Sequence, residues 1–260
     1  MLCCIDIGNT NIVIGLWEKG GWRAKFRLRT VSEKMPDEYA MLIKSIMADR
    51  GFTFEDISDI IIACVVPRLK TVFTKLFNEY GGINPLFVEP GVRTGLHIRT
   101  ENPSELGADI VADAVAAYTR LGGPCVVVDF GTATTFSAVS EDGEFLGVAI
   151  APGLEVSAEA LARSTAQLPH ITLQRPGSVI GKNTIHSMQA GLVYGYIGLV
   201  EYLVRKMIDE IGGDVKVIAT GGLCGLIVPL TELITEMDPE LTLDGLRIIG
   251  KKNFKRYEEY

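Results

Sequence analysis

The chain opens with two apolar runs separated by a short polar turn. Residues 2–6 and 12–17 have the length and side-chain composition of buried strands, and residues 8–10 between them form a glycine-containing turn. The spacing of apolar positions becomes that of a helix over residues 39–49, and a β-branched run follows at 60–66. Because strand and helix patterns alternate in this way, the sequence predicts an α/β fold with a largely parallel sheet covered by helices.

The opening pattern returns in residues 124–143, at a shift of 123 positions. Residues 129–131 (Asp-Phe-Gly) align with residues 6–8 (Asp-Ile-Gly), and Thr134 aligns with Asn11. A single Asp-x-Gly turn is a weak signal because it occurs in many hairpins. Two copies in register predict two duplicated α/β domains that face each other across a cleft. Chain-breaking residues at 121–124 place the boundary between domains 1–121 and 122–260.

Composition and charge exclude several classes of protein. The longest wholly apolar run, residues 60–66, is far shorter than the ~20 residues of a membrane-spanning helix, so we expect no membrane partner. A net charge of −7 argues against nucleic acid as the main partner, because phosphate contacts need a positive surface. The first residues do not resemble a signal peptide, and we expect a cytoplasmic protein. Five cysteines without a C-x-x-C pair and three scattered histidines indicate neither a disulfide framework nor a zinc site.

Two Asp-x-Gly hairpins offer the groups that bind a polyphosphate. Glycine lets the backbone approach a ligand closely, and the amide N–H groups of a tight turn can surround anionic oxygens. A carboxylate at a strand end can hold a hydrated magnesium ion or a monovalent cation. Each hairpin alone could be an ordinary turn, but the pair favours phosphate binding from both sides of a triphosphate. The hydroxyl groups that could donate to phosphate are those of Thr10, Thr132, Thr134 and Thr135.

Other phosphate-binding patterns fail on spacing. Residues 177–183 resemble a P-loop, but only three residues separate the glycines, and Asn183 stands where Ser or Thr would contact magnesium, so we predict a loop. The chain has no G-x-G-x-x-G pattern, which leaves a dinucleotide fold without support. Gly221 and Gly222 follow a predicted strand at 215–219, where a flat nucleoside could approach closely, although a Gly-Gly pair at such a place is more often a plain turn.

Several motifs together resemble the type III pantothenate kinases, a family in the superfamily of acetate kinases, sugar kinases and actin. The resemblance runs over nearly the whole chain and implies two ribonuclease H-like (actin-like ATPase) domains with a nucleotide cleft between them. It also implies transfer of the ATP γ-phosphoryl group to the primary alcohol of pantothenate, the first step of coenzyme A synthesis. The motifs are residues 6–11, 65–67, 107–109, 129–135, 150–153, 183–189 with Gly191, and 220–222.

The resemblance implies where ATP and its cations bind. Asp6 is expected near Mg²⁺, Asp129 at a monovalent cation, K⁺ or NH₄⁺, and Thr132 at ATP. The first ATP phosphate loop is expected to consist of Asp6, Ile7, Gly8, Asn9, Thr10, Asn11, Ile12 and Val13.

The resemblance also implies a pantothenate site and a homodimer. Asp109 would be the base that accepts the proton of the substrate hydroxyl, and Thr184 would reach pantothenate across the dimer interface. An ordinary Asp has a pKa of about 3.9, so Asp109 would be ionised at neutral pH without special tuning. The residues that would line the site are Gly107, Ala108, Asp109 and Ile110.

A different interpretation of Asp109 is a solvated helix face. Glu101, Glu105, Asp109 and Asp113 recur every four residues, which places them on one side of a helix if the helix extends that far. Like charges at this spacing are mildly destabilising, so helix stability does not explain these four carboxylates. Such a face could still contain one functional member.

The sequence departs from the family at the substrate site. The family usually has Arg directly after the catalytic Asp, where this chain has Ile110, and Ser137 replaces a frequent Asp after the second phosphate loop. Loss of a guanidinium removes up to five N–H donors and a positive charge that could pair with the pantothenate carboxylate. One alternative is therefore a kinase for a different small alcohol. The resemblance itself implies a second alternative, a catalytically weak ATP-binding transcriptional accessory factor, because relatives that resemble the family act in this way.

Overall fold

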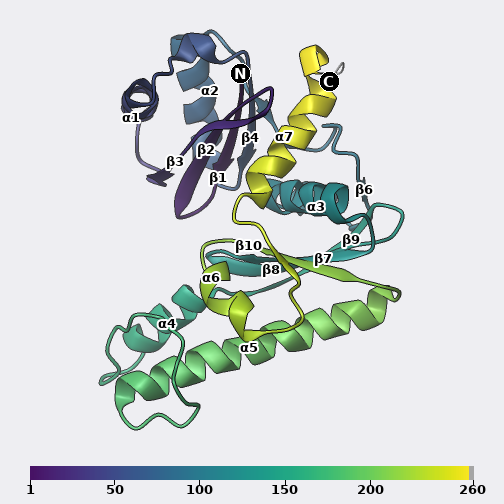
Figure 1. Ribbon diagram of the computed structural model, residues 1–260. Coiled ribbons are helices and arrows are strands. Elements are labelled where there is room, and N and C mark those ends of the chain that lie inside the picture. Colours follow the sequence, from purple (N-terminus) through teal and green to yellow (C-terminus); the bar gives the residue numbers. More distant parts are fainter. Residues whose placement is uncertain (258–260) are drawn as a thin grey trace. The chain divides into compact units, whose positions relative to one another are not determined.

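The computed structural model describes residues 1–257, which form two compact units. Unit 1 contains Met1–Gly95, Glu101–Ala116 and the chain from Leu241 on, and unit 2 contains Leu96–Thr100 and Ala117–Glu240. Each unit has its own sheet (Figure 1). The α/β fold class is confirmed. Both sheets are mixed, however, and the expectation of a largely parallel sheet is wrong, because each unit contains a three-stranded antiparallel meander.

Unit 1 is built on a five-stranded sheet in the order β3-β2-β1-β4-β5. The first three strands form the antiparallel meander, while β4 and β5 run parallel to β1. Apolar side chains on both faces of β1 are buried, which explains why this run is continuously apolar instead of alternating. The strands are β1 (Leu2–Ile7), β2 (Asn11–Glu18), β3 (Gly21–Arg29), β4 (Asp59–Cys64) and β5 (Leu86–Phe87).

Helices cover both faces of this sheet. Ile5 of β1 lies in a core with Tyr39 of α1 (Pro36–Asp49) and Phe73 of α2 (Pro67–Gly81). Leu2, whose side chain points to the other face, lies against Gly250 of α7 (Leu241–Asn253). Figure 1 shows α7 on the side of the sheet away from α1 and α2. Short 3-10 helices in this unit are Phe54–Asp56, Pro103–Glu105 and Lys255–Tyr257.

Unit 2 has a six-stranded sheet in the order β11-β10-β7-β8-β9-β6. The 28-residue helix α5 (Thr184–Ile211) packs against β7 and β8, and α4 (Leu154–Arg163) packs against α5 (Figure 1). Neither α5 nor any other helix within residues 1–257 combines the length and apolar character needed to cross a membrane. The remaining elements are β6 (His97–Ile98), β7 (Cys125–Phe130), β8 (Ala133–Val139), β9 (Glu144–Pro152), β10 (Lys216–Thr220), α6 (Cys224–Ile227), the 3-10 helix Val228–Leu230 and β11 (Glu236–Met237).

The two meanders share one topology, but their first turns differ by one residue. Counted between the last paired residues, four residues, 8–11, separate Ile7 from Ile12, whereas three residues, 131–133, separate Phe130 from Thr134. Thr134 therefore occupies the position of Ile12, and its predicted alignment with Asn11 is wrong. Because a shift of one residue turns a side chain to the opposite face of a strand, Thr134 is fully buried whereas Asn11 is exposed.

The two units are not continuous in sequence. The C-terminal helix α7 packs against β1, and β6 pairs with β9 although it precedes the repeat in the chain. Helix α3 (Ala108–Leu121) passes from unit 1 into unit 2 after Ala116. The boundary between 121 and 122 stays a prediction, since it divides the chain linearly, whereas the packing units exchange segments.

Gly245 sets how closely α7 approaches α3. A Cβ atom at this position would lie 1.9 Å from the carbonyl oxygen of Ala112, and a helix backbone cannot move aside as a flexible side chain can. We expect Gly245→Ala to lower the free energy of unfolding by about 3 kcal/mol through overpacking. Chemical denaturation measures the change, with Gly225→Ala as the control because its added Cβ meets nothing within 4 Å. Equal stability of the two variants would contradict this account of the helix contact.

Candidate active site

The first turn has a fixed backbone and presents its polar side chains to solvent. The Gly8 N–H donates to the Asn11 carbonyl at 3.0 Å, and the Thr30 hydroxyl donates to the Gly8 carbonyl at 2.7 Å. The Thr30 N–H donates to the Thr10 carbonyl at 2.9 Å. The side chains of Asn9, Thr10 and Asn11 are exposed. The turn is therefore shaped by the protein on one side and open to a ligand on the other.

Two members of the expected phosphate loop cannot offer their side chains to ATP. Ile7 and Ile12 are fully buried in the core of unit 1, so only their backbone groups could contact a nucleotide. Asp6 lies at the carboxyl end of β1, aligned with Ala63 of the parallel strand β4. Ligands in open α/β sheets bind at the carboxyl ends of parallel strands, so this position suits a carboxylate near Mg²⁺.

The second turn is enclosed by two glycines that are distant in sequence. The Gly153 N–H donates to the Thr132 carbonyl at 3.1 Å, and a Cβ atom on Gly153 would lie 2.4 Å from that oxygen. Gly221 has a left-handed φ of +94°, and a Cβ atom there would lie 2.5 Å from Asp129 Oδ1. The structure therefore brings Asp129 and Gly221 together. Gly153 belongs to the family motif 150–153, but it is not among the predicted site residues, because its contact with the turn exists only in three dimensions.

The Asp129 carboxylate fits a cation that takes most of its ligands from elsewhere. Within residues 1–257, no three His, Cys, Asp or Glu side chains come together as a metal site. Asp129 is instead a carboxylate flanked by the backbone of Gly131 and Gly221, an arrangement that suits a cation coordinated also by carbonyls, water or phosphate. Gly222 is exposed, and a Cβ atom there would meet nothing within 4 Å. Its backbone therefore leaves room for a ligand.

The expectation that Thr134 donates to phosphate is wrong. Thr134 is fully buried, and its hydroxyl group hydrogen-bonds with that of Tyr196 on α5. Thr132 is exposed and Thr135 is half-buried, so Thr132 is the better placed hydroxyl donor of this turn. Tyr196 carries no sequence signal, because it is one of several large side chains on the buried face of a long helix.

Asp109 lies in the first turn of α3, with its carboxylate close to the backbone. The Ile110 N–H donates to Asp109 Oδ1 at 2.8 Å, and a Cβ atom on Gly107 would lie 2.5 Å from the same oxygen. Burial raises the pKa of Asp109 above the usual 3.8, and hydrogen bonds from backbone N–H groups offset only part of this effect. The expectation of an untuned carboxyl group is therefore wrong, and the direction of the pKa shift strengthens Asp109 as a base.

The interpretation of Asp109 as part of a solvated helix face is also wrong. Helix α3 begins at Ala108, so Glu101 and Glu105 precede it and lie exposed. Asp113 does lie one turn beyond Asp109 on α3, but it is only 2% exposed. The four carboxylates therefore do not share one environment.

Thr184 is the first residue of α5 and is exposed. Asn183 caps the helix, because its side chain accepts a hydrogen bond from the His186 N–H at 2.9 Å. Residues 177–183 contain neither helix nor strand, which confirms the loop predicted for this segment.

The predicted site residues are divided between the two units. Unit 1 contains Asp6, Ile7, Gly8, Asn9, Thr10, Asn11, Ile12, Val13, Gly107, Ala108, Asp109 and Ile110, and unit 2 contains Asp129, Thr132, Thr184, Gly221 and Gly222.

Comparisons with known proteins agree with the resemblance. The family model described as type III pantothenate kinase matches residues 2–206. The type III pantothenate kinase of Koribacter versatilis is 46% identical over 97% of this chain and 96% of its own length, and that of Moorella thermoacetica is 47% identical over 97% and 100%. The solved structure of MreB 5 of Spiroplasma citri bound to AMPPNP, at 10% identity and a TM-score of 0.59 over 99% of this chain and 98% of its own, shows the actin-like ATPase fold. The chain therefore belongs to the type III pantothenate kinase family.

Proposed function

We propose that this protein uses ATP to phosphorylate the primary alcohol of pantothenate, the first step of coenzyme A synthesis. The environment of Asp109 is the observation that supports this proposal most strongly. In a chain of this family Asp109 is a half-buried carboxylate at the start of a helix, with a raised pKa and a glycine two residues before it that leaves its oxygen uncrowded. Because burial disfavours its charged form, this carboxylate accepts a proton more readily than an exposed one.

Asp109 acts as a general base in this proposal. The substrate oxygen forms a bond to the γ-phosphorus, its O–H proton passes to the Asp109 carboxylate, and the bond from the γ-phosphorus to ADP breaks. Backbone N–H groups of turns 8–11 and 131–133 stabilise the phosphate oxygens, and the Thr132 hydroxyl adds a donor. Most of the rate enhancement in such a reaction comes from positioning and charge stabilisation.

We assign Asp6 to Mg²⁺ and Asp129 to a monovalent cation, K⁺ or NH₄⁺. Bound cations neutralise charge that develops on phosphate oxygens. Asp6 lies at the carboxyl end of β1, and Asp129 lies at the matching end of β7 beside the Gly221 backbone. Each carboxylate is thus next to a turn that offers amide groups to phosphate.

The proposed pantothenate site consists of Gly107, Ala108, Asp109 and Ile110, with the hydroxyl of Thr184. Ile110 is half-buried and apolar, so it brings no charge toward the pantothenate carboxylate. The same observation favours a second candidate function, a kinase for a small alcohol without a carboxylate. A comparison of ADP release with pantothenate and with its uncharged alcohol analogue distinguishes the two functions.

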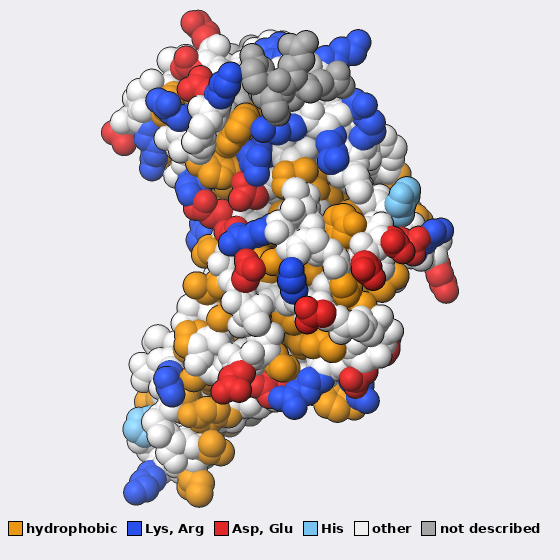
Figure 2. Space-filling model, turned by 45° about the vertical axis from the view of Figure 1, so that its right-hand side comes forward, with side chains coloured by type: hydrophobic (Ala, Val, Ile, Leu, Met, Phe, Trp, Pro, Cys, Tyr) orange, Lys and Arg blue, Asp and Glu red, His pale blue; other side chains and the backbone are white. Residues whose placement is uncertain are grey.

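We also propose a homodimer, with Thr184 of one copy reaching the substrate site of the other. Gly191, Gly195 and Gly198 lie on one exposed face of α5, and a Cβ atom on any of them would meet nothing within 4 Å. Tyr202, 63% exposed, extends this face by one turn, and Figure 2 shows other apolar side chains at the surface of unit 2. Light scattering would give about twice the chain mass of 28.3 kDa for such a C₂ dimer.

The pH dependence of turnover should reflect Asp109. Protonation removes the base, so kcat falls as the pH falls through the pKa of Asp109, which lies above 3.8 because the group is buried. The same shift means that ionisation of Asp109 lowers folding stability as the pH rises from 3.8 to the folded-state pKa. Measurement of kcat at saturating substrate concentrations across the acidic pH range gives the pH at which turnover falls. An acid limb at or below the usual Asp value would contradict the assignment.

A coupled assay of ADP release tests the proposed function. The rate should depend on pantothenate, ATP, Mg²⁺ and a monovalent cation together, and omission of any one of them should abolish it. ADP release that does not respond to pantothenate or to any other alcohol, in a chain that still binds nucleotide, would favour the accessory-factor alternative.

A further inference from the structure

Tyr196 places a buried hydroxyl group directly beneath the second turn, although the proposed chemistry makes no use of it. The residue is 6% exposed, and its ring packs against that of Phe130, the last residue of β7 before the turn, with the ring centroids 6.1 Å apart. Its hydroxyl group hydrogen-bonds with Thr134, which follows the turn directly and is fully buried. Neither partner is open to solvent, so water cannot easily replace this bond.

The Tyr196 side chain also lies next to the segment on the other side of the turn. Tyr196 and Leu154 belong to the same buried hydrophobic core, and Leu154 directly follows Gly153. Gly153 in turn donates to the Thr132 carbonyl at 3.1 Å and leaves no space for a side chain there. The Tyr196 hydroxyl group therefore holds the strand that leaves the turn, and its ring lies in one core with the segment that packs over the turn.

Tyr196 also lies within the field of Asp129. Burial raises the pKa of the Tyr196 phenol most, and the Asp129 charge raises it further. The phenol therefore keeps its proton at neutral pH and remains a hydrogen-bond donor.

We propose that Tyr196 is a positioning residue whose hydroxyl group holds turn 131–133 and the end of β7 in the arrangement that receives ATP phosphate and the monovalent cation. The inference rests on the proposed function of this turn. Tyr196 acts through its hydrogen bond with Thr134 and through its packing in one core with Phe130 and Leu154, which flank the turn.

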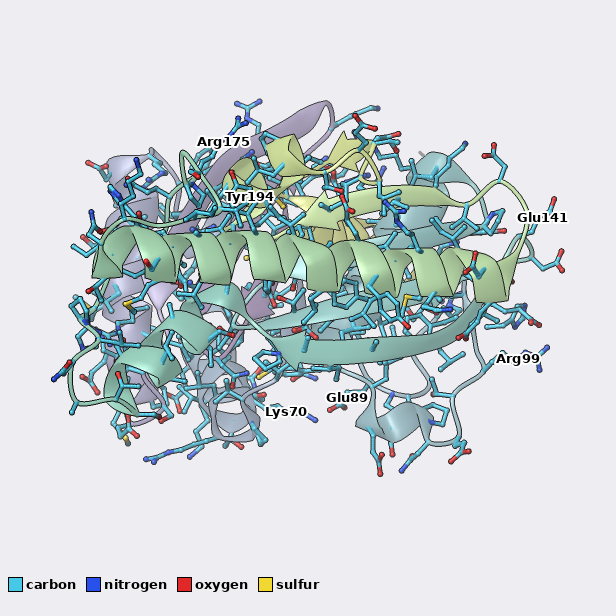
Figure 3. The ribbon with its side chains drawn as sticks, turned by 90° about the horizontal axis from the view of Figure 1, so that it is seen from below. Lys70, Glu89, Arg99, Glu141, Arg175 and Tyr194 are labelled. Atoms are coloured by element: carbon cyan, nitrogen blue, oxygen red, sulfur yellow. The ribbon has the colours of Figure 1, made fainter. Side chains whose placement is uncertain are left out.

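Tyr196→Phe tests the proposal because it removes only the hydroxyl group. We expect the Kd for ADP, measured by calorimetry, to rise about fivefold or more, the change that corresponds to one lost hydrogen bond. The K⁺ concentration for half-maximal turnover should rise as well, while the KM for pantothenate stays unchanged. Tyr194→Phe is the matched control, because the Tyr194 hydroxyl donates at 3.0 Å to the Pro176 carbonyl and not to a residue of the turn. Figure 3 labels Tyr194 and Arg175, the residue that precedes Pro176 in the chain. The control variant should keep the wild-type Kd.

A second pair of variants keeps the test decisive if Tyr196→Phe does not fold. Thr134→Val removes the partner hydroxyl group and should reproduce the weaker ADP binding, whereas Thr134→Ser keeps the hydroxyl group and should restore it. The double variant Tyr196→Phe/Thr134→Val should bind ADP about as weakly as either single variant, since both remove the same bond.

The outcomes separate this inference from the proposed function. A lower Tm for Tyr196→Phe with wild-type constants for ADP and K⁺ would show a purely structural residue and overturn the inference. A wild-type chain that binds ADP but does not phosphorylate pantothenate would contradict the proposed function, and the comparison of ADP affinities would still decide the role of Tyr196. A wild-type chain without ADP binding would overturn both.

Discussion

Asp109→Asn should lower kcat by about 10²–10⁴-fold, the usual contribution of a general base, while ATP binding stays nearly unchanged. The amide keeps the shape of the side chain and can still accept the hydrogen bond from the Ile110 N–H at its oxygen. It cannot accept the proton of the substrate hydroxyl. Steady-state kinetics give kcat, and calorimetry with a non-hydrolysable ATP analogue gives the nucleotide affinity.

Glu105→Gln is the matched control for this variant. Glu105 precedes α3, is exposed, and accepts a hydrogen bond from the Asn102 side chain at 2.7 Å. It loses the same charge in the same region of the chain, but it should keep the wild-type rate. An unchanged rate in Asp109→Asn would remove Asp109 from its role. An equal loss in both variants would point to a general effect of charge.

Gly221→Ala should disrupt the surroundings of the Asp129 carboxylate. The new Cβ would lie 2.5 Å from Asp129 Oδ1 and 2.7 Å from the Phe130 nitrogen, and φ at this position is +94°. Left-handed strain and overpacking together should lower the free energy of unfolding by about 2–5 kcal/mol. Because small displacements of catalytic groups have large effects, kcat/KM for ATP should fall by about 100-fold.

Gly222→Ala is the control for the backbone strain. Its added Cβ meets nothing within 4 Å, so the Tm should stay close to the wild-type value. Thermal unfolding and the response of turnover to K⁺ distinguish the two variants. If Gly221→Ala keeps both the wild-type Tm and the wild-type K⁺ response, Gly221 is not needed to shape the surroundings of Asp129.

The sequence predicts the strands and turns that carry the site because glycine and polar residues interrupt apolar runs there. The predicted strand 2–6 and turn 8–10 agree with β1 (Leu2–Ile7) and the turn at 8–11 within one residue. The second turn is harder to predict. A sequence alignment of the two hairpins does not show whether three or four residues lie between the last paired residues of the strands. That single residue decides whether the Thr134 hydroxyl faces phosphate or the core.

The contacts that enclose the site residues could not be predicted from sequence. Gly153, Tyr196 and the clash that Gly107 avoids with Asp109 depend on atoms that only the folded backbone brings together. The burial of Asp113 is equally invisible, since a carboxylate on a helix is exposed in most proteins. Asp109 itself is found by its motif, but its raised pKa follows from burial that only the structure contains.

The proposed function requires this chain to transfer a phosphoryl group from ATP to pantothenate with Asp109 as the base. The most direct measurement incubates wild-type protein and Asp109→Asn with γ-labelled ATP, Mg²⁺, K⁺ and pantothenate, and identifies the labelled product by mass spectrometry. We predict pantothenate phosphorylated at its primary alcohol with the wild-type protein, and almost none with the variant. Labelled inorganic phosphate alone, or equal amounts of phosphorylated pantothenate from both proteins, would contradict the claim.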